Sequence, residues 1–195
     1  MMIFGGNDCF SGFYNDVWVL SNANGLGGTP AWTQLALAGA APSARSNASA
    51  VYDPTSNRMI VFGGSSTAEV WILLNANGLG GAPAWTQLTP SPGPAGRYAQ
   101  SAVYDTANNR MTIFGGGANS GLLNDVWVLS NANGLGGTPV WTQLAPAGAI
   151  PPAPRAAHTA VYDPASNVMT IFGGYIDSQE IPISDVFTLQ HANGL

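Results

Sequence analysis

The stretch Met59-Ile60-Val61-Phe62-Gly63-Gly64 places a fully apolar run directly before two glycines, and the same ending recurs three more times in the chain. The other copies end in Phe4-Gly5-Gly6, Phe114-Gly115-Gly116 and Phe172-Gly173-Gly174. The first glycines of successive copies are 58, 52 and 58 residues apart. Self-similarity at a period of this length indicates a stacked or radial repeat protein, in which features common to every copy are architectural and features found once are candidates for specificity.

The sequence around Gly63-Gly64 predicts four short strands in each repeat. We expect strands over 49–52, 59–62, 70–74 and 85–88. Turn formers such as Asp53-Pro54 and a Gly- and Asn-rich loop over 75–83 separate them. The middle two strands are apolar on both faces, so both faces of the sheet must be covered. Antiparallel sheets packed face to face around an axis meet this requirement, which predicts an all-β propeller.

Aromatic and arginine residues recur in phase with the glycine pairs. An aromatic residue stands in each third strand, at Trp18, Trp71, Trp127 and Phe187. A tryptophan opens three fourth strands, at Trp32, Trp85 and Trp141, and an arginine precedes three first strands, at Arg45, Arg97 and Arg155. Over nearly the whole chain this pattern resembles the kelch repeat, although its loop before the fourth strand is long. The resemblance implies a kelch-type β-propeller that recognises a protein or another ligand through one face of its disc.

We divide the chain, as a single propeller domain, into blade units at about 1–36, 45–90, 97–146 and 155–195. The first unit lacks an innermost strand and the last lacks an outermost one. Three arrangements fit: a piece of a longer ring, a half-ring that pairs with a second copy, and a small closed ring of four blades. We favour a fragment or an oligomer, because unpaired strand edges promote association. Residues 15–36 and 124–145 differ only at Ala31 and Val140, which suggests recent duplication or deliberate copying.

The composition disfavours several classes of partner. Five arginines, no lysine and ten acidic residues give a net charge of −5, so binding to nucleic acid or to anionic membranes is disfavoured. No apolar run is long enough for a transmembrane helix. The single cysteine, Cys9, excludes an intrachain disulfide. Low charge together with abundant Asn, Thr and Ser slightly favours a bacterial extracellular location.

Most charged residues and glycines are assigned to the architecture because they recur in each repeat. Asp53, Asp105 and Asp163 close the first strands and are expected to form turns. We expect the three arginines to pair with the acids before the third strands and to link the ring. These acids are Asp16, Glu69, Asp125 and Asp185. The glycine pairs let a strand end sharply and a neighbouring blade approach closely, at Gly63, Gly64, Gly115, Gly116, Gly173 and Gly174.

The two ends of the predicted blades differ in how much their loops vary. The loops that follow the glycine pairs, at 7–14, 65–68, 117–123 and 175–184, differ in length and content. The loop Asn-Ala-Asn-Gly-Leu-Gly-Gly before the fourth strand hardly changes. Strand direction places these sets at opposite ends, which we name the variable end and the constant end. Because binding residues usually lie on loops held by a rigid scaffold, we expect the site at the variable end.

The candidate binding residues are aromatic, polar or acidic groups expected at the variable end. They are Phe10, Phe13, Tyr14, Asn47, Tyr98, Gln100, His158, Tyr175, Asp177 and Glu180. The aromatic residues either form a stacking surface for a sugar or peptide or pack beneath the loops. His158 is either an ordinary polar group or a general base or metal ligand. Acids repeated in every blade do not suit the single carboxylate pair of a glycosidase.

The leading interpretation is a non-catalytic binding or scaffold module with a protein, or a glycan, as its ligand. The alternatives are a lectin-like protein, a propeller that resembles galactose oxidase, and a purely architectural repeat that self-associates. The oxidase chemistry requires a tyrosine–cysteine crosslink and histidine copper ligands, whereas Cys9 is the only thiol and His158 and His191 are expected at opposite ends. We therefore predict no cofactor, no metal and no catalytic residues.

Overall fold

The fold is entirely β in the part of the chain that the structure, a computed structural model, describes: every residue except 9, 11, 149 and 178. Its strands form four antiparallel sheets. The first sheet contains β1 (Met2–Asn7), β2 (Phe13–Ser21) and β3 (Ala31–Gln34). The second contains β4 (Ser49–Asp53), β5 (Arg58–Phe62), β6 (Val70–Leu74) and β7 (Ala84–Leu88). The third contains β8 (Ser101–Asp105), β9 (Arg110–Ala118), β10 (Gly121–Ser130) and β11 (Val140–Leu144). The fourth contains β12 (Thr159–Asp163), β13 (Val168–Phe172) and β14 (Val186–Gln190).

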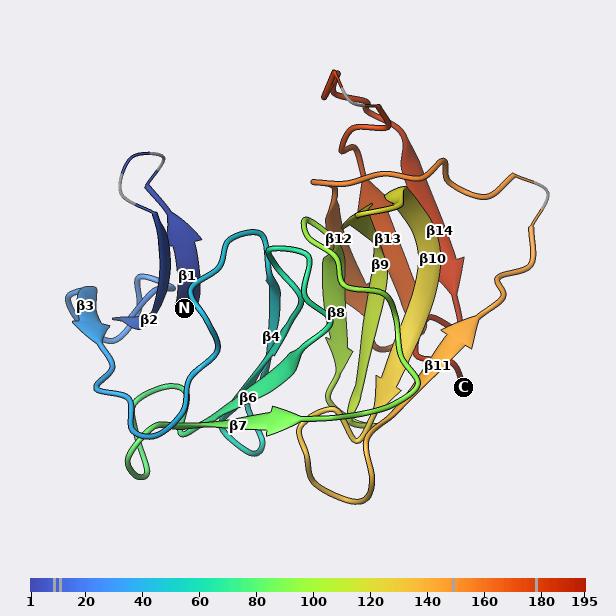
Figure 1. Cartoon of the computed structure of the whole chain (residues 1–195). Coiled ribbons are helices and arrows are strands. Elements are labelled where there is room, and N and C mark those ends of the chain that lie inside the picture. Colours follow the sequence, from blue (N-terminus) through green and yellow to red (C-terminus); the bar gives the residue numbers. More distant parts are fainter. Residues whose placement is uncertain (9, 11, 149, 178) are drawn as a thin grey trace.

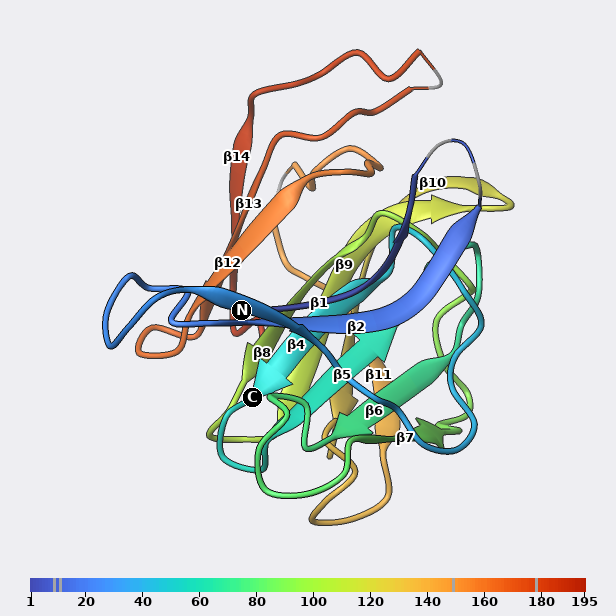
Figure 2. The same ribbon diagram turned by 90° about the vertical axis from the view of Figure 1, so that its left-hand side faces the viewer.

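The sheets follow one another in space in their order along the chain. Figure 1 shows the first sheet at one end of the row and the last at the other, with the two four-stranded sheets between them, and Figure 2 gives the orthogonal view. The innermost strand β8 lies between the innermost strands β4 and β12 and contacts both of them. This arrangement confirms the expected all-β propeller blades, with three-stranded first and last blades. None of the described segments forms a helix that is long and apolar enough to span a membrane.

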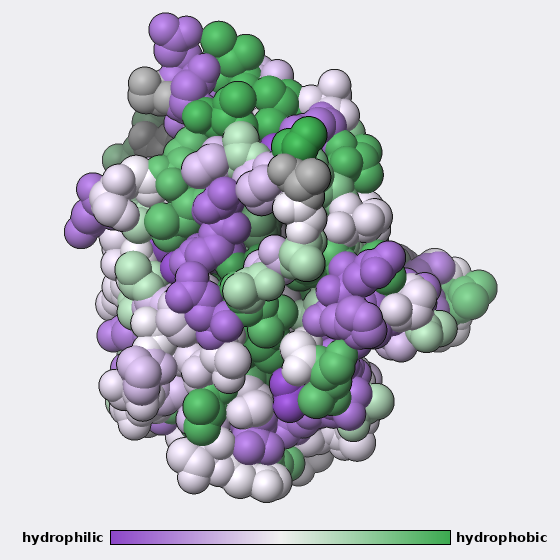
Figure 3. Space-filling model, turned by 90° about the vertical axis from the view of Figure 1, so that its right-hand side faces the viewer, coloured by the Kyte–Doolittle hydropathy of each residue, from purple (hydrophilic) through white to green (hydrophobic). Residues whose placement is uncertain are grey.

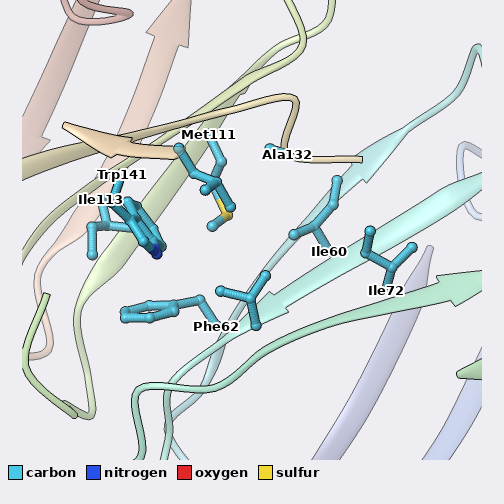
Figure 4. Close-up of a cluster of buried hydrophobic side chains, with 9 residues drawn as sticks. Ile60, Phe62, Ile72, Met111, Ile113, Ala132 and Trp141 are labelled. Atoms are coloured by element: carbon cyan, nitrogen blue, oxygen red, sulfur yellow. The ribbon is translucent and has the colours of Figure 1, made fainter. Parts of the chain in front are cut away.

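The hydrophobic core consists of layers between adjacent blades. In Figure 4, Ile60, Phe62 and Ile72 of the second blade face Met111, Ile113 and Trp141 of the third. The Phe62 and Trp141 rings meet edge to face with centroids 5.2 Å apart, and Phe4 and Trp85 repeat this contact at 5.1 Å between the first two blades. Trp85 and Trp141 thus pack on the Phe-Gly-Gly phenylalanine of the preceding blade, which explains why both residue types recur in phase.

The end blades lack such a layer on their outer sides. Phe172 and Val186 of the last blade are more than half exposed, whereas their counterparts Phe62 and Val70 in the second blade are buried. Figure 3 views the molecule from the side of β11 and β14, and hydrophobic residues gather over the upper half of this surface. The apolar residues of these strands therefore match a sheet covered on both faces, and only the second and third blades are covered in this way.

The glycine pairs serve close packing in all blades, but the prediction that they end their strands is wrong in two of them. β1 and β9 continue through their glycines, with a shift of register at Phe4/Gly6 and at Leu123/Val126. A Cβ on Gly63 would lie 2.7 Å from the carbonyl oxygen of Arg97 in the next blade. The pair is therefore required where backbones of adjacent blades approach, whether or not the strand ends.

Candidate functional site

Three arginines with buried guanidinium groups form ion pairs beneath the loops of the variable end, and their carboxylate partners are partly exposed. Arg97 donates from Nη1 to Asp125 Oδ1 at 2.6 Å and from Nη2 to Asp125 Oδ2 at 2.9 Å. Arg155 binds Asp185 in the same bidentate way, and Arg45 donates to Glu69 Oε2 at 2.5 Å. Each guanidinium also donates to the carbonyl of the first glycine in its own blade. The expected arginine–carboxylate pairing is present in these three blades.

The same arginines link neighbouring blades through their backbones. The N–H of Gly64 donates to the carbonyl of Arg97 in the next blade at 2.8 Å, and Gly6 and Gly116 make the equivalent bonds to Arg45 and Arg155. Burial works to raise the pKa of the Asp125 carboxyl, but the hydrogen bonds from Arg97 and Trp127 and the charge of Arg97 outweigh it and lower that pKa. These carboxylates are accordingly ionised partners in the scaffold.

Asp16 departs from this pattern. Its carboxylate accepts hydrogen bonds from Trp18 Nε1 at 2.7 Å and from Gln34 Nε2 at 3.4 Å. Among the described residues no arginine pairs with it, because the three paired arginines belong to the second, third and fourth blades. The expectation of an ion pair is thus wrong for the first blade.

Gln100 and His158, three residues after their arginines, are buried between blades. Gln100 Nε2 donates to the Phe62 carbonyl at 2.9 Å, and His158 Nε2 lies 2.8 Å from Ser101 Oγ. Burial lowers the pKa of His158 to about 4, and the charge of Arg155 adds to this shift. The imidazole is therefore neutral near pH 7 and packed against the Phe114 ring. These contacts favour a structural role for both residues.

Asn47 lies on the chain segment before β4. It is exposed and has a φ of 57°. Its carbonyl accepts a hydrogen bond from the Ala99 N–H at 2.9 Å, and the Ala99 carbonyl accepts the same bond from Ala157. This position therefore carries backbone hydrogen bonds from one blade to the next, a function that its side chain does not determine.

The aromatic candidates divide between two places. The β1–β2 loop holds Phe10, which is 98% exposed, and Phe13 and Tyr14 follow it at the start of β2. Asp8 shapes this loop, since its Oδ1 accepts from the Phe10 N–H at 2.9 Å and its Oδ2 from the Tyr14 hydroxyl at 2.8 Å. Figure 1 places this loop in the first blade, far from the β13–β14 loop. The aromatic residues thus do not form one continuous stacking surface.

Tyr98 and Tyr175 are brought together from adjacent blades. Tyr175 exchanges two backbone hydrogen bonds with Ala156, and Ala157 donates to the carbonyl of Ala99, directly after Tyr98. Burial raises the pKa of Tyr175, and the nearby Glu180 carboxylate and Tyr98 raise it further. This second group, which we name the tyrosine cluster, consists of Tyr98, Tyr175 and Glu180.

The loop beside the tyrosine cluster exposes apolar side chains. Ile176 and Ile181 lie on the β13–β14 loop and are 44% and 54% exposed. Asp177 Oδ1 accepts from the Gln179 N–H at 3.0 Å, so Asp177 shapes the turn. The tyrosine cluster therefore borders the exposed apolar side chains of Ile176 and Ile181.

The constant end contains an interblade latch that the sequence did not reveal. Asn133 Nδ2 donates to Asp53 Oδ2 of the preceding blade at 2.7 Å, and Asn193 does the same to Asp105. The prediction of turns was correct for these acids, since Asp53 also accepts from the Thr55 N–H. The signal for the latch was the unchanging second Asn of the Asn-Ala-Asn-Gly loop, together with Arg58 and Arg110, which repeat 52 residues apart.

No group of three or more His, Cys, Asp or Glu side chains suited to a metal ion occurs among the described residues. His158 lies at the variable end, whereas His191 follows β14 at the constant end, where its Nδ1 lies 3.1 Å from the Leu195 carbonyl oxygen. Cys9 lies outside the described residues.

Comparison with known proteins identifies related chains. Residues 80–193 match the family described as the KLHDC2/KLHL20/DRC7 Kelch-repeats domain, which is more than half of the chain. Adagio-like protein 1 of Oryza sativa subsp. japonica is 30% identical over 82% of this chain and 24% of its own length. Adagio protein 3 of Arabidopsis thaliana is 29% identical over 81% and 24%. The chain thus spans about a quarter of these relatives.

Among solved structures, the one titled "Structure of YjhT" superposes with a TM-score of 0.51 and 19% sequence identity. The match covers 68% of this chain and 35% of that one. At this identity the likeness bears on the fold alone.

Proposed function

The chain belongs to the kelch-repeat family, and from this premise we propose that it is a non-catalytic protein-binding module that uses the variable end of its blades. The observation that supports the proposal best is the tyrosine cluster with Ile176 and Ile181 beside it. Tyrosine is a frequent energetic anchor of protein interfaces, and an apolar patch with a polar rim is their usual composition.

The chemistry around the cluster favours binding over catalysis. His158 is buried and hydrogen-bonded by Ser101, so it is not presented to a ligand as a general base. The three buried arginines are occupied by carboxylates and carbonyl groups of the scaffold. The surface therefore offers mainly shape, aromatic area and the Glu180 charge, which suits a peptide or protein with apolar and basic groups.

Selection of phage-displayed peptides on the immobilised protein tests the proposal. We expect the selected peptides to lose at least about tenfold in affinity for the double variant Ile176→Ser/Ile181→Ser, since burial of each side chain contributes over 1 kcal/mol. The matched control is Leu26→Ser/Leu79→Ser, which removes two apolar groups that are even more exposed, at 72% and 69%, from two constant-end loops and should leave affinity unchanged.

Two results would count against this function. Peptides that respond to the Leu26/Leu79 variant and not to the Ile176/Ile181 variant would move the site to the constant end. Saturable binding on a glycan array that disappears in Tyr175→Ala, with no peptide selected, would replace protein recognition by the lectin-like alternative.

A further inference from the structure

The charged residues of the chain are divided unequally between the two ends of its blades. Seven of the ten acids lie at the variable end: the four acids that precede or open the apolar part of the third strands, and Asp8, Asp177 and Glu180. Three of the five arginines lie beneath the same loops, whereas Arg58 and Arg110 donate to carbonyl groups at the constant end. Four of the five net negative charges therefore belong to the variable end.

The positive charges of the variable end are hidden from solvent. The side chains of its three paired arginines are at most 1% exposed, whereas those of Glu69 and Asp185 are 38% and 42% exposed. Asp177 and Glu180 are exposed as well. In the part of the chain that the structure describes, this end offers no exposed guanidinium, and the sequence contains no lysine. A partner with acidic groups would find no counter-charge here, and a partner with basic groups would find several.

Tyr98 presents its ring at this end in a fixed position. Its N–H donates to the Gly117 carbonyl at 2.9 Å, and the Gly117 N–H donates to the Tyr98 carbonyl at 2.8 Å. A Cβ on Gly117 would lie 2.5 Å from Tyr98 Cζ, so the ring lies directly on the backbone of this glycine. Asn7, Ser65 and Tyr175 occupy the same position in the other blades, so the third blade alone has the glycine that this close approach requires.

Tyr175 extends from a neighbouring stretch of backbone. The Gly116 N–H donates to the Arg155 carbonyl at 2.8 Å. The residue after Gly116 pairs with Tyr98, and the residue after Arg155 pairs with Tyr175. The two tyrosines therefore meet at the boundary between the third and fourth blades, each held by a pair of backbone hydrogen bonds.

Glu180 brings a negative charge to the two tyrosines. Tyr175 forms a β-bridge with Pro182, and the Glu180 N–H donates to the Asp177 carbonyl, so the loop between them turns back towards Tyr175. Burial raises the pKa of the Tyr175 hydroxyl, and the Glu180 carboxylate raises it further. A field that disfavours a phenolate anion favours a cation at the same place. Tyrosine rings beside a carboxylate are suited to hold the charged group of a lysine or an arginine.

We propose that the variable end binds a basic segment of a partner protein. A lysine or arginine of this segment lies against the rings of Tyr98 and Tyr175, with its charge near the Glu180 carboxylate. A neighbouring apolar residue of the segment packs on Ile176 and Ile181. The proposal rests on the protein-binding function above and adds the chemistry of the ligand: the cation selects the partner, and the isoleucines supply apolar area.

The probe is a phage-selected peptide, synthesised with a fluorophore, and its affinity for the full chain is measured by fluorescence anisotropy. Each basic residue of the peptide is replaced in turn by an uncharged analogue, citrulline for arginine and norleucine for lysine. Glu180→Gln removes the charge at the cluster. The matched control is Asp8→Asn, which removes the same charge from the loop of the first blade and keeps the Oδ1 acceptor of the Phe10 N–H. Tyr175→Leu keeps an apolar side chain but removes the aromatic ring.

We expect the selected peptides to contain a basic residue whose neutral analogue lowers the affinity about tenfold, since this change removes a cation–π contact and an ion pair together. Glu180→Gln and Tyr175→Leu each remove one of the two, so each should cost about threefold. Asp8→Asn should bind normally. Glu180→Lys should prefer the peptide in which the basic residue is replaced by glutamate, a reversal of preference that misfolding does not produce.

Two results would overturn this inference and leave the protein-binding function standing. The first is a set of peptides that depend on Ile176 and Ile181 but carry no basic residue, or whose affinity is unchanged in both Glu180→Gln and Tyr175→Leu. The second is a loss in Asp8→Asn equal to that in Glu180→Gln, because the charge would then act over the whole surface and not at the cluster. Absence of any saturable peptide would overturn both proposals.

Discussion

At the constant end of the blades an asparagine amide crosses from one sheet to the next, whereas at the variable end each buried guanidinium binds a carboxylate of its own sheet. Asn133 reaches Asp53 of the neighbouring blade, and Arg97 reaches Asp125 within its blade. The crossing residue belongs to the loop itself, so the loop sequence is fixed by the contact. The arginine layer lies beneath the loops, which leaves the loops above it free to differ. This contrast accounts for one monotonous and one diverse set of loops on the same strands.

The largest effect on stability is expected when a buried guanidinium at the variable end is removed. Arg97→Ala removes the charge that pairs with the Asp125 carboxylate, which keeps only the hydrogen bond from Trp127, and it removes the donor to the Gly115 carbonyl; we expect the free energy of unfolding to fall by about 3–5 kcal/mol. Urea denaturation of the full chain measures this loss. Arg58→Ala is the control, because Arg58 is less buried and donates to a single carbonyl, that of Asn133. Equal losses of unfolding free energy in Arg97→Ala and Arg58→Ala would show that the buried arginines do not stabilise the fold more than a partly exposed arginine does.

The constant end is tested by cutting one latch. Asn133→Ala removes the hydrogen bond to Asp53 and the acceptor for Asn109 Nδ2 and the Leu135 N–H, so a loss of about 2–3 kcal/mol is expected. Asn24→Ala changes the same position of the first blade. Its Oδ1 accepts a hydrogen bond from the Leu26 N–H at 2.9 Å within its own loop, so less than about 1 kcal/mol should be lost. Similar denaturation midpoints for the two variants would mean that crossing between blades does not stabilise the fold.

The pH dependence of stability tests whether His158 is a buried, neutral residue at the variable end. The pKa of His158 falls to about 4 in the folded state, below its ordinary 6.5. Between these pH values the His158 side chain binds a proton in the unfolded chain but not in the folded chain. Its contribution to stability is therefore fully present above pH 6.5 and is lost as the pH falls towards 4. We expect a loss of about 2 kcal/mol between pH 7 and pH 5 from this group.

Gln100 supplies the matched variant for this prediction, because it occupies the same position in the preceding blade. His158→Gln should keep stability near pH 7 and abolish the decline between pH 7 and pH 5, as followed by thermal unfolding at each pH. A decline that persists unchanged in His158→Gln would place its origin elsewhere. Acid loss below about pH 4 remains in both proteins, since the pKa values of Asp53 and Asp105 are also lowered, by hydrogen bonds that outweigh burial.

The repeats explain why the sequence predicted the fold better than the site. Strand positions follow from apolar runs bounded by turn residues, and the predicted 70–74 coincides with β6 (Val70–Leu74). The arginine–carboxylate pairs were predicted because opposite charges recur at the same end of each blade. The latch of Asn133 on Asp53 was not, because the amide looks like an ordinary turn residue until the blades are placed side by side. The meeting of Tyr98 and Tyr175 depends on the offset between two blades, which strand periodicity does not encode.

The smallest effect on stability is expected in the variable-end loops, whose residues differ from blade to blade. Ile176→Ser/Ile181→Ser changes two exposed side chains of a variable-end loop, so the free energy of unfolding should shift by less than about 0.5 kcal/mol. Urea denaturation beside Asn133→Ala measures the difference between the ends directly. A loss as large as that of Asn133→Ala would make the β13–β14 loop part of the scaffold. A negligible loss of unfolding free energy together with weaker peptide binding would show that the two isoleucines contribute to binding a partner and not to the stability of the fold. The residues that stabilise the constant end would then be distinct from those that bind at the variable end.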